Sequence, residues 1–161
     1  MNDATPDVMD ALAGLPPGSA VAELRRQRPD VVRYTQASDE AIFAPADEGG
    51  LTRLERLAAA LRVAVRLHDA TLGDHYRERL VALLGGKAPE HAEGDAKRRG
   101  LIHDHVDRVT SDPDSATKAN IDALLAGGLS PHAVVSLSQV IAYVNFQSRV
   151  LAGLRMLRDA T

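Results

Sequence analysis

Two histidines and a glutamate interrupt an apolar helical pattern in the middle of the chain, and these residue types could carry acid–base chemistry. The residues are Glu55, His68 and His75. A histidine with a neighbouring carboxylate is a usable general base or acid near pH 7. Their spacing therefore raises the question of whether the fold brings them together.

The spacing leaves two geometries open. If residues 51–84 form one straight helix, His68 and His75 lie about 10 Å apart along its axis. Glu55 then lies about 30 Å from His75. If instead the chain reverses just before Asp69, which can cap a second helix, Glu55 and His75 reach similar depths on antiparallel helices. His68 would point inward, and the three side chains would share one wall of a pocket. The alternative is that they are polar residues at a helix–helix corner.

Two other groups of polar residues are candidates for chemistry. The segment His103-Asp104-His105-Val106-Asp107 resembles a metal-binding spacing. On a helix His103 and Asp107 share a face while His105 points elsewhere, so we favour a solvated face and expect no metal.

The last apolar segment carries Gln139, Asn145, Gln147 and Arg149. Buried polar groups need partners, which favours a hydrogen-bond network between helices or subunits. The other interpretation is that these residues line a small pocket beneath His75. Arg149 is expected to meet a carboxylate, a carbonyl or a ligand anion.

Composition restricts the classes of function. The 161 residues are 45% hydrophobic and 25% charged, with a net charge of −3 and a pI of about 6.0, which disfavours a nucleic-acid partner. No cysteine is present, so disulfides, thiolate metal sites and thiol-based catalytic cycles are excluded. No segment is long and apolar enough for a membrane span, and residues 1–15 do not resemble a signal peptide. We expect a cytoplasmic protein without a cofactor.

The positions of proline and glycine between apolar periodic segments predict an all-α protein. Residues 1–50 are expected to form an N-terminal helical arm, and residues 51–161 the main helical domain. The expected helices of the two parts lie at about 5–14, 19–27, 29–43, 51–67, 69–84, 96–109, 113–127 and 131–158.

The final helix is apolar on nearly every face from Val134 to Leu157. A helix of this kind requires cover on all sides, and a small domain has little room to enclose it. We therefore expect a homo-oligomer, a dimer or larger, in which the last helix meets the core on one face and a second subunit on another.

The pattern Leu51-x-x-x-Glu55-x12-His68-x-x-Thr71-x-x-x-His75 resembles the active-site segment of the alkylhydroperoxidase D-like family, which includes the carboxymuconolactone decarboxylases. That family is all-α and carries a glutamate followed by Cys-x-x-Cys-x-x-x-His. His68 stands at the first cysteine position and Thr71 at the second, while Glu55 is one residue out of phase with the family glutamate. The sequence from Ala126 to Arg149 and the segment His105–Pro113 also resemble the family. The similarity extends over residues 29–157.

The resemblance implies an alkylhydroperoxidase D-like helical bundle without the family's thiol peroxidase chemistry. What remains is the decarboxylase-like branch, in which proton transfer acts on a small carboxylated substrate. His75 would be the general base or acid, Glu55 would orient it, and His68 would be a second proton carrier or an anion contact. Thr71 and Arg149 would contact the substrate. The competing hypothesis is a non-catalytic oligomeric member of the family, and convergence of the two histidines on one enclosed pocket would discriminate between them.

Overall fold

The computed structural model describes residues 7–86 and 95–161, and every regular element within these ranges is helical. This confirms the predicted all-α class. The first part contains α1 (Val8–Ala13), α2 (Ala20–Arg26) and α3 (Pro29–Phe43). The remainder contains α4 (Arg53–Arg66), α5 (Ala70–Leu83), α6 (Ala96–Ser111), a short 3-10 turn (Pro113–Ser115), α7 (Lys118–Ala126) and α8 (Pro131–Asp159).

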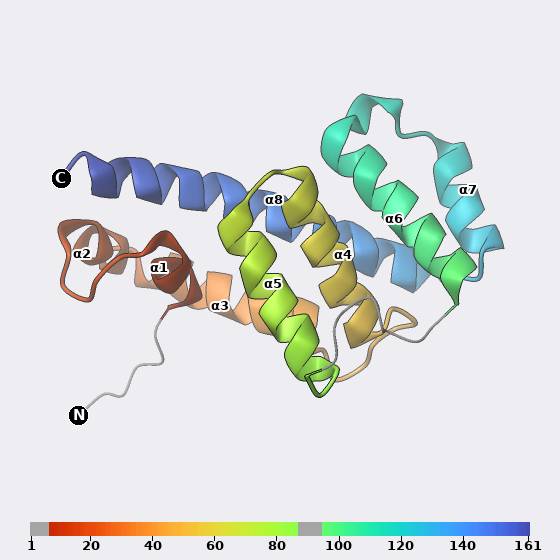
Figure 1. The fold of residues 1–161 in the computed structure, drawn as a ribbon, viewed down its shortest axis with the longest axis horizontal. Coiled ribbons are helices and arrows are strands. Elements are labelled where there is room, and N and C mark those ends of the chain that lie inside the picture. The colour runs from red at the N-terminus through yellow and green to blue at the C-terminus, as the bar shows by residue number, and fades with distance from the viewer. Residues whose placement is uncertain (1–6, 87–94) are drawn as a thin grey trace.

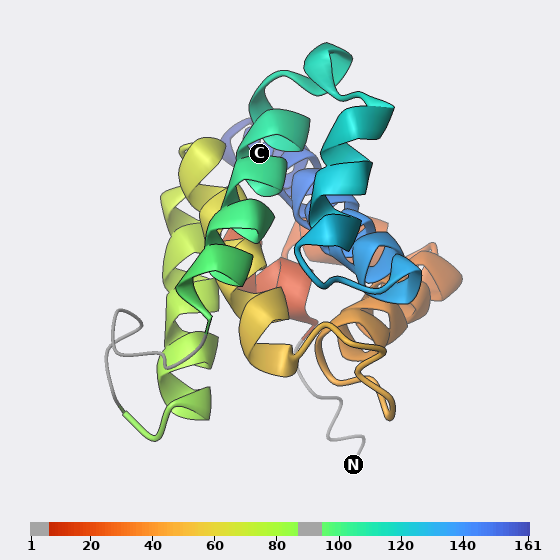
Figure 2. The ribbon, with the colours of Figure 1, turned by 90° about the vertical axis from the view of Figure 1, so that its right-hand side faces the viewer.

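The long helix α8 is the axis of the bundle (Figure 1). Helices α1 and α2 pack near its C-terminal end, whereas α6 and α7 pack toward its beginning. The antiparallel pair α4–α5 lies across its middle, with α4 in contact with α8. Figure 2 shows α6 and α7 side by side, and Figure 1 shows that they lie at the opposite end of the molecule from α1 and α2.

A single cluster of buried apolar side chains joins the helices. Met9 of α1, Phe43 of α3, Leu57 of α4 and Val144 of α8 all belong to it. Side chains of the predicted arm therefore share a core with the predicted main domain. The division at residue 50 stays a prediction.

The buried side chain of Arg56 holds the connection between α3 and α4 in place. Its guanidinium group donates hydrogen bonds to the backbone carbonyls of Ile42, Glu48 and Leu51 at 3.1, 2.9 and 2.9 Å. A buried charge is tolerated where its donors are satisfied in this way. Burial lowers the pKa of Arg56, against the opposing effect of Glu48 and Glu55. The start of α4, which carries Glu55, is thus tied to the end of α3.

Candidate functional site: the corner between α4 and α5

The chain reverses between α4 and α5, as the second of the two predicted geometries required. Helix α4 ends at Arg66, and α5 begins at Ala70 with Asp69 as its N-cap. The Asp69 carboxylate accepts a hydrogen bond from the Leu72 amide at 3.2 Å. The prediction of a corner with Asp69 as a cap is confirmed.

The turn places His68 in a backbone conformation that glycine normally occupies. Its φ is +55°, and it is the non-glycine residue with positive φ among those that the structure describes. The amide of His68 donates to the carbonyl of Val65, and the amide of Asp69 donates to the carbonyl of Ala64, both at 3.1 Å. This is the Schellman arrangement of a helix C-terminus, in which the left-handed residue is most often glycine. Histidine is one of the side chains tolerated there, at some cost in conformational energy.

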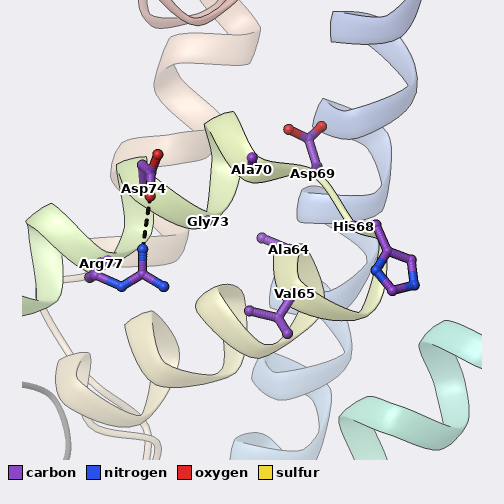
Figure 3. A pocket seen from close by; sticks show the side chains of 8 residues that line it. All are labelled: Ala64, Val65, His68, Asp69, Ala70, Gly73, Asp74 and Arg77. Atoms are coloured by element: carbon purple, nitrogen blue, oxygen red, sulfur yellow. Dashed lines mark hydrogen bonds and ion pairs between the residues drawn. The ribbon is translucent and has the colours of Figure 1, made fainter.

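An open hollow of about 310 Å³ lies at this corner (Figure 3). Its polar side chains are His68, Asp69, Asp74 and Arg77, and Asp74 and Arg77 form an ion pair at 2.8 Å. The His68 imidazole lies at one side of the hollow and the Arg77 guanidinium at the other. The apolar part of the wall consists of Ala64, Val65, Ala70 and Gly73.

His68 is exposed and does not point inward, so that expectation is wrong. That expectation assumed that the apolar helical pattern of α4 continues through residue 68. The helix ends at Arg66 instead, and the left-handed conformation of His68 turns its side chain out of the helical register.

Asp69 is fixed by α8 as well as by its own helix. One carboxylate oxygen accepts a hydrogen bond from the Ser148 hydroxyl at 3.1 Å and lies 3.7 Å from the Arg155 guanidinium. The side chain of Asp69 is almost fully enclosed, with 7% of it exposed. The acid nearest to His68 is therefore already paired, and its geometry is set by α8.

His75 lies on a different face of α5 from the hollow. Residues 70, 73, 74 and 77 of α5 line the hollow at helical spacing, whereas His75 faces Arg79 and the ring of Tyr76. Its Nε2 lies 3.4 Å from Arg79 Nη1. Because a guanidinium group only donates, this contact requires a neutral His75 whose proton is on Nδ1. Burial lowers the pKa of His75, and Arg79 lowers it further against Asp39 and Glu78, which keeps the ring neutral.

Arg79 connects His75 to α3. It forms an ion pair with Asp39 at 3.0 Å, and its guanidinium carbon lies 4.6 Å from the centre of the Phe43 ring. Two buried hydrogen bonds tie α8 to these helices: the Tyr76 hydroxyl of α5 donates to Gln147 of α8, and the Tyr143 hydroxyl of α8 donates to the Thr35 carbonyl of α3 at 3.2 Å. Burial raises the pKa of both tyrosines, so both hydroxyls stay protonated.

Glu55 does not reach His75, and the expectation that the two residues lie at similar depths on α4 and α5 is wrong. Glu55 completes a capping box with Thr52 and forms an ion pair with Arg98 of α6. Burial favours a raised pKa for Glu55, but hydrogen bonds from Arg98 and Thr52 outweigh it and the pKa is lowered. The two residues are separated because they lie at different distances from the corner. Glu55 lies about 17 Å from it along α4, and His75 lies only about 8 Å from it along α5.

The remaining predicted site residues lie outside the hollow. Thr71 is exposed in the first turn of α5, and Arg149 is exposed on α8. No contact within the described residues ties Arg149 to a carboxylate, because the residue belongs to the face of α8 that points away from the core. The prediction of a network is confirmed for Gln147, which is fully buried against Tyr76. These positions do not test the proton-transfer roles of His68 and His75 or the substrate contacts of Thr71 and Arg149. Both sets of roles stay predictions.

The residues of the segment His103–Asp107 lie in two different environments. Asp107 forms two hydrogen bonds with Arg62 of α4, at 2.7 and 2.6 Å. His105 is buried instead, at 7% exposure, and lines a separate cavity between α6 and α7. The expectation of a solvated face is therefore wrong for His105. Its burial follows from α7, which covers this side of α6.

Comparison with known proteins supports the fold and does not extend to an activity. No family model matches the sequence, and no curated protein matches it. A solved structure described as an uncharacterized peroxidase-related protein from Silicibacter sp. TM1040 matches with a TM-score of 0.66 and 17% sequence identity. The match covers 76% of this chain and 67% of that chain. The match shows that this chain shares an all-α helical fold with that protein.

Within residues 7–86 and 95–161, the helices do not combine the length and apolar character that crossing a bilayer requires.

Proposed function

We propose that the protein is a carboxymuconolactone decarboxylase-like protein that carries out cofactor-free acid–base chemistry on a small carboxylated substrate at the corner between α4 and α5. The observation that carries the proposal is His68, an imidazole held at positive φ on the rim of a hollow. An unfavourable backbone conformation supports a functional hypothesis when glycine would fit the position better. The absence of cysteine excludes the thiol peroxidase cycle.

In this proposal His68 takes the proton-transfer role that the family pattern gave to His75. Imidazole groups as a class exchange protons near neutral pH. His68 is exposed to a ligand in the hollow, whereas the Nε2 atom of His75 is engaged by Arg79. His75 becomes a positioning residue, because its Nε2 contacts Arg79, which pairs with Asp39 of α3.

The substrate carboxylate would be held by the first turn of α5 and by Arg77. The amides of Ala70 and Thr71 precede the first intrahelical bonds of α5, and such groups favour an anion. Arg77 adds a guanidinium group on the same wall. The two acids of the hollow are each compensated, Asp74 by Arg77 and Asp69 by Ser148 and Arg155. Thr71 and Arg149 are left at the periphery.

The proposal is tested by release of carbon dioxide from a carboxylated γ-lactone of the muconolactone type. We expect turnover by the wild type and its loss in His68→Asn, because asparagine keeps the left-handed backbone and cannot exchange the proton. Thr71→Ala, at an exposed position three residues after His68, is the control: it keeps the backbone amide and is expected to retain most of the rate. Absence of turnover in the wild type, or full turnover in His68→Asn, would contradict the proposal.

A second candidate is a non-catalytic oligomeric member of the same fold. It is favoured by the separation of His68 and His75, which do not share a hollow. It is also favoured by an apolar surface on α8 and α3 that includes Phe146, Val31 and Tyr34, exposed by 42%, 53% and 62%. An open groove of about 400 Å³ runs between these helices. Self-association through this surface is compatible with both candidates.

A further inference from the structure

The cavity between α6 and α7 lies apart from the corner of α4 and α5 and contains an imidazole without a partner. Its volume is about 140 Å³. His105 is 7% exposed, and its Nδ1 atom is buried without a hydrogen bond. Buried polar atoms are paired in most proteins, so an unpaired one indicates a missing partner. The residues around the cavity are Leu101, Asp104, His105, Arg108, Asn120, Ala123 and Leu124.

Two side chains of opposite charge, Asp104 and Arg108, line this cavity without forming an ion pair with each other. Asp104 and Arg108 occupy positions one helical turn apart, where an acid and an arginine usually attract each other. No ion pair between them is present in the described part of the chain, and Arg108 instead donates to the Ser115 hydroxyl at 3.3 Å. The wall therefore offers one carboxylate and one guanidinium group to a ligand.

Asn120 of α7 supplies a further oriented polar group. Its carboxamide oxygen accepts hydrogen bonds from the amide and the hydroxyl of Thr117 at 2.8 and 2.9 Å. The oxygen is thereby committed to the capping box of α7, and the amide nitrogen is left as the donor. The orientation of Asn120 is thus set by the helix start and not by the cavity.

We infer that this cavity binds a small zwitterion, such as a short aliphatic amino acid, between Asp104 and Arg108. Asp104 accepts hydrogen bonds from the ammonium group, and Arg108 donates hydrogen bonds to the carboxylate. His105 contacts the ligand from the buried side. Leu101, Ala123 and Leu124 offer apolar contact for a short side chain. The volume corresponds to about five water molecules, which suits a ligand of about five or six non-hydrogen atoms.

Opposite charges on one wall distinguish a zwitterion from simpler ions. A simple carboxylate would approach Arg108 but also the negative charge of Asp104. A simple ammonium ion would face the reverse conflict at Arg108. Only a ligand with both charges uses both side chains, which is why acetate and methylamine are informative probes.

Titration calorimetry with L-alanine, alongside NMR of the labelled His105 ring, tests this inference on the full chain. We expect saturable binding and a shift of the His105 resonances. Asp104→Asn and Arg108→Gln should each weaken binding by about tenfold, since each removes one charge-assisted contact. Both positions are exposed, so the variants are expected to fold, as circular dichroism would verify. The matched control is Asp122→Asn, an exposed acid of α7 that pairs with Lys118 outside the cavity.

A further variant separates the binding role of His105 from a packing role. His105→Leu should raise the melting temperature, because it removes a buried unpaired nitrogen, and should also weaken alanine binding. The inference is overturned if L-alanine shows no saturable binding, or if acetate alone binds as tightly as L-alanine. It is also overturned if Asp104→Asn, Arg108→Gln or His105→Leu binds L-alanine as tightly as the wild type does.

Discussion

The two histidines of the central motif lie in opposite surroundings, although both belong to the same helical hairpin. His68 is exposed at a left-handed turn beside an open hollow. His75 is partly buried in the interface of α5 with α3, where Arg79 takes its Nε2 and Asp39 pairs with Arg79. A polar group whose partners come from the protein stabilises the fold, whereas one without such partners is free to meet a ligand. The following predictions test this contrast, in order of the expected effect on stability.

The strongest effect is expected in the buried interface. Gln147→Leu leaves the Tyr76 hydroxyl without its acceptor in a fully buried position, at a cost of about 1–3 kcal/mol in unfolding free energy. The double variant Gln147→Leu with Tyr76→Phe removes both polar groups and should recover most of the loss. Urea denaturation measures both values. Equal losses in the single and the double variant would mean that the hydrogen bond is not the cause.

At the corner, the effect is expected to depend on backbone preference. His68→Val should cost about 1–2 kcal/mol, because a branched side chain disfavours the left-handed conformation. His68→Gly and His68→Asn should be neutral or slightly stabilising, since both residues accept positive φ. Thermal unfolding of the three variants tests this order. A loss in His68→Gly as large as in His68→Val would show that the imidazole itself stabilises the fold.

The sequence predicts those features of the two histidine environments that neighbouring residues determine. It does not predict those that depend on contacts between helices. The corner follows from Asp69 as a cap and from the end of the apolar helical pattern, and the starts of α3 and α8 follow from Pro29 and Pro131. The surroundings of His75 do not follow, because its rotation about α5 depends on the contacts of Arg79 with α3. The separation of Glu55 from His75 could have been obtained by counting residues from the corner. The pairing of Tyr76 with Gln147 joins distant segments, and only their shared burial hints at it.

The pH dependence of stability tests whether His75 is neutral in the folded state. The pKa of His75 is lowered from 6.5 by burial and by Arg79, so the unfolded chain binds this proton more readily. His75 therefore contributes stability above about pH 6.5 that is lost as the pH falls through this value toward its folded pKa. His75→Gln should lose less stability than the wild type between about pH 7 and 5. An identical acid profile in the variant would contradict a neutral, partly buried His75.

The apolar surface of α8 should affect assembly with little effect on the fold. Phe146→Glu changes an exposed residue and should shift unfolding free energy by less than about 0.5 kcal/mol. Light scattering at micromolar concentration is expected to show an oligomer for the wild type and a monomer of 17.2 kDa for the variant. Ile141 is unsuitable for this test because it is buried, so a charge there would unfold the chain. A monomeric wild type would contradict the proposed self-association.

The most direct test is to observe which histidine responds to a carboxylated ligand. NMR spectra of the protein with labelled imidazole rings can be recorded during titration with a carboxylated γ-lactone, after assignment with His68→Asn and His75→Gln. We predict a saturable shift of the His68 resonances and little change at His75, because only His68 faces the hollow. A saturable shift at His75 with none at His68 would contradict the assignment of the site to the corner between α4 and α5.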